Sequence, residues 1–421
     1  MLNLTRFVDY SLVYLLVAMS GVPFFVFGGN KVMAILFMYA LAVFIYRKKR
    51  IHKFMVYYLL VLALIQILQT VKFYFMPWAL LWALHMRILF AYFVLSCVEE
   101  KFLKYYVNTL VVSTLISLVF YFASYVPGFE NMLNEKLASK IHNPLVTPGN
   151  YRIWPNIIVY TLNTKDGGAI LRNSGPFWEP GANAGFLVLA IIFNIMMHKT
   201  LFDRNNKILM FGLLTTMSTT GLVAMMVIVS AFTLAKAKLA VKIMVVPIMV
   251  AVFGLAYSSL DILGKKIEDK MNTEDAQYNT RFGSFKLDLK DALENPFVGL
   301  GVHLKTRFKG ETDPVKIHRN NGVSMVMGDY GIIVFLVFFS LYYINYRRLC
   351  MYHRFNPIFA LYALALTLLI GFSETYFSKP LFFTFTFIGL VYKGTHPLLK
   401  EETAFASFNS LNTNFSLKQT R

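Results

Sequence analysis

The chain has 421 residues, of which 57% are hydrophobic and only 15% are charged, and its formal net charge is +19. An average soluble domain carries roughly 25% charged residues, so this composition excludes an ordinary soluble core. Apolar segments of roughly 20 residues, long enough to cross a bilayer, recur along the chain. The sequence therefore predicts an all-α polytopic integral membrane protein.

We predict about twelve transmembrane segments from the apolar runs and from the charges of the loops that join them. The least regular pair lies between residues 207 and 235, because its Ser/Thr-rich centre fits either a tight external turn or part of a broken helix. The predicted spans are 9–27, 31–46, 54–75, 78–97, 105–126, 183–198, 207–217, 219–235, 240–257, 323–345, 357–372 and 379–393.

The excess positive charge lies in the short loops between these spans, and the run from Arg47 to Arg50 is its strongest example. The two long loops, 127–182 and 258–322, carry nearly balanced charge. Basic residues gather on the cytoplasmic side of membrane proteins. This pattern predicts a multi-pass protein of the bacterial inner membrane with both termini in the cytoplasm. It also argues against nucleic acid as a partner.

The chain divides into alternating membrane parts and loops. The first long loop is rich in Pro, Gly and Asn and is predicted to be irregular but compact. The predicted parts are five N-terminal helices (1–126), the first periplasmic loop (127–182), central helices (183–257), the second periplasmic loop (258–322), C-terminal helices (323–393) and a polar cytoplasmic tail (394–421).

The second long loop carries a predicted helix from about residue 281 to 293. Thr280 can cap its first turn, and Asn295-Pro296 ends it. An apolar face would allow this helix to lie on the membrane surface. The residues of that face are Phe282, Phe285, Leu289 and Leu293.

The first candidate cluster runs from Arg172 to Asn183, at the external end of a predicted span. Arg172 offers a planar fork of donors suited to a diphosphate, although an arginine at this level also serves as a headgroup anchor. Glu179 stands at the start of the helix, where the helix dipole favours a carboxylate. Its alternative role is a solvated N-terminal cap.

The second and third clusters belong to the other long loop. Arg281 would stand beside the free N–H groups at the start of the short helix, a natural anion site, or would be an ordinary solvated arginine. His318, just before the span at 323, would act as a general base or hold a sugar hydroxyl, or would simply be solvated. Its neighbours Arg319, Asn320 and Asn321 are further substrate-binding candidates.

Two ionisable residues outside these clusters are also candidates for substrate binding. Arg87 falls inside a predicted span, where a charge is costly and usually faces a cavity. Glu374, in a short external turn, would face the same cavity or water. The chain contains no Walker loop, no HExxH and no Cys/His metal spacing, so no cofactor and no metal are expected.

The three clusters, their order and the topology together resemble the O-antigen polymerase and ligase superfamily. Its pattern is Arg-x-x-Gly-x-Phe-x-(Glu/Asn)-Pro leading into a helix, then an Arg-led helix ending in Asn/Asp-Pro-x-x-Gly-x-Gly, then a His-Asn segment before a helix with an early Gly. The matching segments are Arg172–Pro180, Arg281–Gly301 and His318–Gly331. The match covers mainly residues 165–345, and Arg319 separates the His and Asn that are more often adjacent in the family.

The resemblance implies a GT-C-like architecture and a metal-independent glycosyl transfer at the periplasmic face. The donor would be a glycan on undecaprenyl diphosphate, bound by Arg172 and Arg281, and the acceptor would be a sugar hydroxyl. His318 would orient or deprotonate that hydroxyl, with Glu179 as the rival base. The spans would open laterally for the polyprenyl tail, and a Wzz-like chain-length regulator is a candidate partner.

Three functions remain to be distinguished. Glu179 stands where ligases of this superfamily often show Asn, which favours a Wzy-type polymerase acting in O-antigen, capsule or exopolysaccharide synthesis. The first rival is an O-antigen ligase that transfers the glycan to lipid A–core. The second is a non-enzymatic transporter or flippase, whose functional polar residues would lie near mid-membrane. Among the candidates here only Arg87 fits that position.

Overall fold

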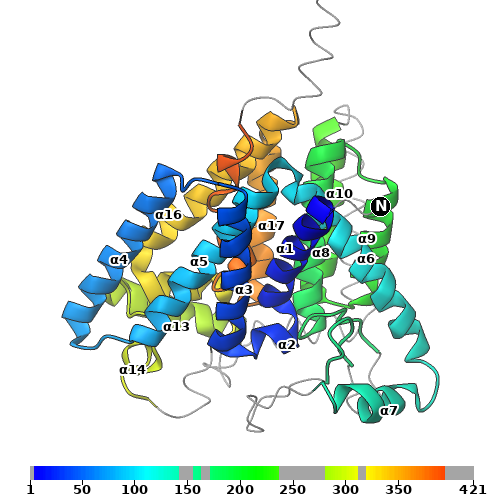
Figure 1. Cartoon of the computed structure of the whole chain (residues 1–421), viewed down its shortest axis with the longest axis horizontal. Coiled ribbons are helices and arrows are strands. Elements are labelled where there is room, and N and C mark those ends of the chain that lie inside the picture. Colours follow the sequence, from blue (N-terminus) through cyan, green and yellow to red (C-terminus); the bar gives the residue numbers. More distant parts are fainter. Residues whose placement is uncertain (1–3, 142–154, 163–170, 237–279, 312–318, 394–421) are drawn as a thin grey trace, which may run out of the picture.

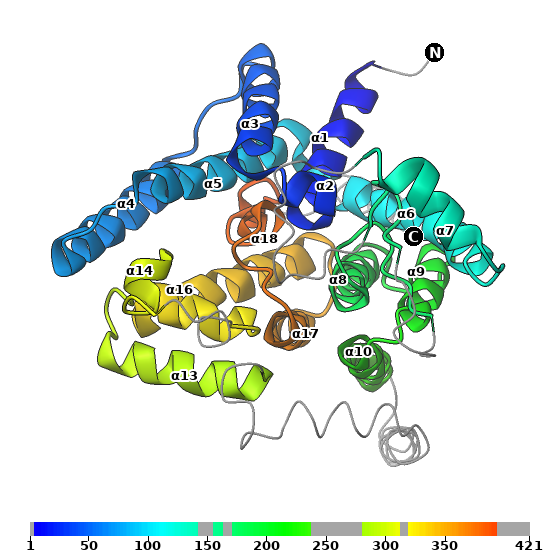
Figure 2. The ribbon, with the colours of Figure 1, turned by 90° about the horizontal axis from the view of Figure 1, so that it is seen from below.

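The computed structural model describes residues 4–141, 155–162, 171–236, 280–311 and 319–393. The regular secondary structure of these residues is helical, with no β-strand among them. This confirms the predicted helical class. The helices stand in a bundle around a single large apolar core, and α4 leans away from the rest (Figures 1 and 2).

The helices of the N-terminal part and of the first loop follow the predicted order. Short 3₁₀ and π turns, Glu99–Lys101 and Asn134–Ala138, continue the ends of α5 and α7. The helices are α1 (Leu4–Gly21), α2 (Pro23–Val26), α3 (Gly29–Tyr46), α4 (Lys53–Phe73), α5 (Trp78–Val98), α6 (Phe102–Ala123) and α7 (Phe129–Leu133).

The remaining described helices come from the central and C-terminal parts and from the second loop. They are α8 (Pro180–His198), α9 (Arg204–Thr215), α10 (Thr219–Lys236), α13 (Arg281–Glu294), α14 (Leu304–Arg307), α16 (Gly322–Tyr352), α17 (Phe359–Ser373) and α18 (Pro380–Thr384).

Within the described ranges, five stretches are long and apolar enough to cross a membrane: Gly29–Tyr46, Lys53–Phe73, Trp78–Ala123, Pro180–His198 and Gly322–Tyr352. The third contains two of the predicted spans, α5 and α6. These stretches identify a helical membrane protein. The total of about twelve crossings stays a prediction from segment length, and the predicted span 240–257 lies outside the described residues.

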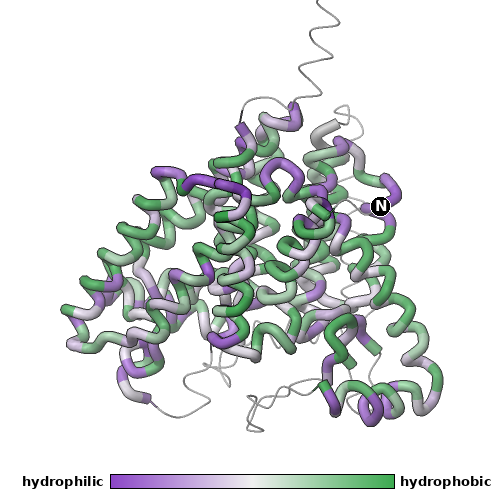
Figure 3. The backbone as a smooth tube through the Cα atoms, viewed as in Figure 1, coloured by the Kyte–Doolittle hydropathy of each residue, from purple (hydrophilic) through white to green (hydrophobic). Residues whose placement is uncertain are grey.

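The loops predicted to lie on opposite sides of the membrane lie at opposite ends of the bundle. The turn between α3 and α4 lies at one end, and α7 and α14 lie at the other (Figure 1). Apolar residues predominate along the helices between these ends (Figure 3). Arg47 in the basic turn is anchored by Asp9, with Nη1 2.5 Å from Oδ1. The separation of the two ends fits the predicted sidedness.

The described residues of the first long loop pack together, which agrees with the predicted compactness. Its residues pack a small apolar cluster against the end of α6, in which the Tyr160 and Phe120 rings stack at 5.5 Å. Leu133 of α7 and Leu171, next to Arg172, are buried in the same cluster. The loop therefore has a core of its own, which supports the segment that leads to Arg172.

The predicted span 379–393 is not a regular helix. It forms α18 and a 3₁₀ turn, Ile388–Leu390, joined by irregular backbone. Side chains from α16 satisfy that buried backbone: Asn345 Nδ2 donates to the Thr386 carbonyl (2.7 Å), and Asn345 Oδ1 accepts from Gly389 N (2.9 Å). Irregular backbone at membrane depth persists only where protein supplies such partners, which apolarity alone does not reveal.

The second long loop docks into a kink of α16. Gly331 adopts φ +86° within that helix. Backbone of the Asn-Pro-x-x-Gly-x-Gly segment fills the kink, because Ile332 N donates to Pro296 O (2.8 Å) and Gly301 N to Asp329 O (2.9 Å). A Cβ at Gly331 would lie 2.5 Å from Pro296 O, so only glycine allows this approach.

The helix predicted in the second loop is confirmed as α13, with Thr280 Oγ1 accepting from Gly283 N at 2.9 Å. Its apolar face is not the buried one. Phe282 and Leu293 are 43% and 64% exposed, whereas Ser284 and Asp288 are fully buried. The small and acidic face packs along α16, at the outside of the bundle (Figure 2). This polar contact leaves the apolar face outward.

Candidate active site

Arg172 is held by the turn between α9 and α10. Its Nε donates to Thr216 O (3.2 Å), and the next residue follows the same path, because Asn173 N donates to Thr215 O (3.0 Å). The Ser/Thr-rich segment therefore forms the tight turn, one of the two alternatives considered for it. Asn183 Nδ2 in α8 donates to Asn173 O (3.2 Å) and ties the Arg172 segment to the start of that helix.

Glu179 occupies the N-cap position of α8, yet its side chain makes no capping hydrogen bond. Instead its carboxylate lies near that of Glu374, from the end of α17. A Cβ added at Gly181 would lie 2.8 Å from Glu374 Oε1 and 3.7 Å from Glu179 Oε1. Glycine at this position therefore makes room for two carboxylates from distant parts of the chain.

Arg281 pairs with one of these carboxylates, that of Glu374, from the other loop. Its Nη2 lies 3.1 Å from Glu374 Oε1, and its Nη1 donates to Asn320 O at 3.0 Å. Its Nε is buried and has no hydrogen-bond partner among the described residues. Glu374 is only 7% exposed, so it faces Arg281 and not water.

The electrostatics of Arg172 link it to these two carboxylates. Burial lowers the pKa of the Arg172 guanidinium, and the carboxylates of Glu179 and Glu374 oppose that shift. Arg172 thus interacts with both acids, and Arg281 is paired with one of them. The four side chains come from the two long loops, the start of α8 and the end of α17.

Asn320 and Asn321 of the third predicted cluster lie beside Arg281 and form hydrogen bonds that hold the local backbone. Asn321 caps α16, because its Oδ1 accepts from Val323 N and Ser324 N at 3.0 Å. Asn320 N donates to Ser284 Oγ at 3.1 Å. These bonds fix the segment that leads into α16. His318, the predicted base, lies outside the described residues.

Arg319 belongs to a separate, largely buried ionic cluster centred on Arg307. The Arg319 Nε lies 3.2 Å from Asp288 Oδ1. Arg307 itself bonds three carboxylates: Asp288, Asp291 at 2.7 Å and Asp329 at 2.9 Å. Burial lowers the pKa of Arg307, but the three carboxylates outweigh it, so the net direction is upward. This cluster joins α13, α14 and α16 behind Arg281.

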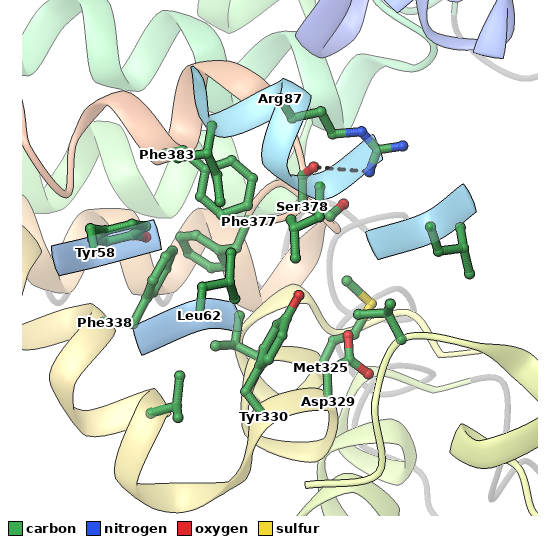
Figure 4. Close-up of a pocket in the computed structure, with 16 residues that line it drawn as sticks. Tyr58, Leu62, Arg87, Met325, Asp329, Tyr330, Phe338, Phe377, Ser378 and Phe383 are labelled. Atoms are coloured by element: carbon green, nitrogen blue, oxygen red, sulfur yellow. Dashed lines mark hydrogen bonds between the residues drawn. The ribbon is translucent and has the colours of Figure 1, made fainter. Parts of the chain in front are cut away.

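Arg87 lines a cavity of about 270 Å³ that none of the four site residues lines (Figure 4). The cavity lies between α4, α5 and α16 and is walled mainly by apolar and aromatic side chains. Arg87 Nη1 donates a long hydrogen bond, 3.5 Å, to Ser378 O. The prediction that Arg87 faces a cavity is confirmed, whereas Glu374 pairs with Arg281 instead of sharing that cavity.

Several polar residues near the candidate site were not among the candidates selected from the sequence. Asp329 lies within a predicted span, and an ionisable residue there is a signal that was available. Lys379 follows the predicted turn at Ser373–Thr375 and lies over the Trp178 ring, 5.6 Å from its centre. The other two partners of Arg307, Asp288 and Asp291, carry no such local signal, because they lie in a different helix from Arg307.

No known protein family and no curated protein sequence matches this chain. The candidate site is therefore interpreted from its own residues.

Proposed function

We propose that the chain is a glycosyltransferase that polymerises undecaprenyl-diphosphate-linked oligosaccharide repeat units at the periplasmic face of the bacterial inner membrane. The observation that carries the proposal is the convergence of Arg172 and Glu179 with Arg281 and Glu374, from segments far apart in the sequence. Two guanidinium groups beside two carboxylates suit a reaction that expels a diphosphate and removes a proton.

In the proposed step, an acceptor sugar hydroxyl attacks the anomeric carbon of the donor. The new C–O bond forms as the bond from that carbon to the phosphate oxygen breaks, and undecaprenyl diphosphate leaves with the electron pair. Arg172 and Arg281 stabilise the charge that grows on the leaving oxygen. Arginine suits this role because its planar fork can bond two phosphate oxygens at once.

The hydroxyl proton passes to a base, for which His318 and Glu179 are the candidates. Among the described carboxylates of the site, Glu374 is bound to Arg281. Glu179 makes no capping bond, so its oxygens are available to a substrate. We therefore assign the base role to Glu179 unless His318 reaches the same hydroxyl.

The test is reconstitution of the purified chain with undecaprenyl-diphosphate-linked repeat units as the only substrate, followed by separation of products by size. A ladder of longer lipid-linked chains is expected. Transfer only when lipid A–core is supplied would identify an O-antigen ligase instead. The absence of transfer with both acceptors would overturn the enzymatic proposal.

A transporter of lipid-linked sugars is the second candidate, and the position of Arg87 favours it. This residue lies in a span beside an internal cavity, where transporters hold substrates. Vesicles that contain the chain and a labelled lipid-linked oligosaccharide on one side distinguish the two. Movement of label across the bilayer without chain growth would favour transport, and chain growth without movement favours the polymerase.

A further inference from the structure

The cavity beside Arg87 has the character of a lipid site. Five side chains from four parts of the fold, Tyr58, Leu62, Phe338, Phe377 and Phe383, present rings and an aliphatic group to it (Figure 4). Its volume of about 270 Å³ accommodates part of an apolar chain, not a whole lipid. One wall is α4, of whose residues only Met55, Gln66 and Gln69 are buried, so the cavity borders the lipid-facing side of the bundle.

Two cations stand together near this cavity, and one of them, Arg87, lines it. Its one hydrogen bond, to Ser378 O, is long at 3.5 Å. Lys379 follows Ser378 in the sequence and lies close enough to Arg87 for the two positive charges to repel each other. The Lys379 ammonium also lies over the Trp178 ring, 5.6 Å from its centre. Neither cation has a carboxylate partner among the residues that the structure describes.

This lack of pairing sets Arg87 and Lys379 apart from other inward-facing cations of the described chain. Asp329 lines the same cavity, but its carboxylate is bound by Arg307 Nε at 2.9 Å. Two adjacent cations in apolar surroundings are costly without a counterion. The paired cations are Arg47 with Asp9, Arg281 with Glu374, and Arg307 with three aspartates.

We propose that Arg87 and Lys379 bind the phosphate of the polyprenyl carrier that is nearer its lipid tail, with the first isoprene units in the cavity. The phosphate would supply the counterion that the two cations lack, and the apolar walls would cover the chain. The identity of the lipid rests on the proposed function. Arg172 and Arg281, already compensated by carboxylates, are left to the sugar side of the diphosphate.

The test is binding of undecaprenyl diphosphate, without any sugar, to the purified full chain in phosphatidylcholine nanodiscs, measured by native mass spectrometry. The double variant Arg87→Gln, Lys379→Gln is expected to bind about tenfold more weakly for each cation removed. The matched control, Lys305→Gln with Lys309→Gln, removes two cations from the second loop and should bind as the parent does. Arg87→Lys, which keeps the charge, should lose no more than about threefold.

A second variant tests the cavity apart from the charges. Leu62→Trp fills the space while both cations remain, and it should also weaken binding. Unchanged binding by the double variant, or equally tight binding of phosphatidylglycerol, would overturn the site. This assay measures binding and needs no sugar transfer. If the parent chain polymerises but the double variant still binds the carrier normally, only the proposed lipid site is refuted. If the parent chain binds the carrier through these two residues but transfers no sugar, only the proposed reaction is refuted.

Discussion

Two arginines at neighbouring places in the fold have opposite surroundings. Arg307 is 4% exposed, and its Nε, Nη1 and Nη2 atoms each bond a different aspartate. Arg281 bonds one carboxylate and one carbonyl, leaves its Nε without a partner in the described chain, and keeps 21% of its side chain exposed. A cation with every donor bonded fastens the structure, whereas one with spare donors and access can bind a ligand. The comparison separates the ionic group that holds the second loop from the group that we propose does chemistry.

The largest effect is expected from Arg307→Ala. It leaves Asp291 and Asp329 without their counterion and Asp288 with Arg319 alone, and breaking a buried ion pair from one side costs about 3–5 kcal/mol. Thermal or denaturant unfolding in detergent measures the loss. The control is Lys309→Ala, which removes an exposed pair with Glu294 and should cost under about 1 kcal/mol. Equal losses for the two variants would refute the fastening role.

Arg281→Ala should show a different pattern, with activity lost and a smaller loss of stability than Arg307→Ala, because the Arg281 side chain is 21% exposed and bonds one carboxylate, that of Glu374. Removing one donor to a developing charge typically costs about 100-fold in rate, or about 2.7 kcal/mol. The turnover of the ladder assay measures the loss, and Arg281→Lys should restore only part of it. Lys286→Ala removes an exposed cation from the same helix and should leave turnover unchanged. A parent-like rate for Arg281→Ala would exclude this arginine from the reaction.

The contrast between the two arginines marks the limit of what the sequence could predict. Apolar run length identified the helices, and turn chemistry identified α13 with its Thr280 cap, because both signals are local. Arg172 and Arg281 were selected for their chemistry and their place in loops. That Glu374 joins them, and that Arg307 binds three aspartates, depends on contacts between distant segments. Such contacts leave no periodicity to read.

The prediction of a regular helix over residues 379–393 was wrong for a related reason. Its composition is as apolar as a helix, and only the Asn345 side chain, from another element, reveals that its backbone is held open. The burial of Ser284 and Asp288 on the polar face of α13 was equally hidden. Amphipathic periodicity predicts a helix with an apolar and a polar face. It does not predict that the polar face is buried, because that burial depends on the ion pair between Asp288 and Arg307 of another helix.

Gly331→Ala tests whether the docked loop supports Arg281. A methyl group at φ +86° is strained and would also meet Pro296 O at 2.5 Å, so a cost of roughly 1–3 kcal/mol is expected. Gly310→Ala separates the two causes, because Gly310 has φ +83° with open space around it. The difference in unfolding free energy between the two variants reports the contact alone. Equal costs would mean that the close approach at the kink contributes nothing.

The smallest effect is expected from Thr280→Ala, which removes the cap one residue before Arg281. The hydroxyl accepts from Gly283 N at 2.9 Å, and loss of such a cap costs about 1 kcal/mol. Turnover should fall only slightly, because Asn320 O and Glu374 still hold the guanidinium. Thr280→Ser keeps the acceptor and should restore stability. If Thr280→Ala instead abolished transfer without affecting unfolding, the start of α13 would itself belong to the binding site. Thr280 would then be grouped with Arg281 as a residue that acts on the substrate, and not with the residues that only stabilise the fold.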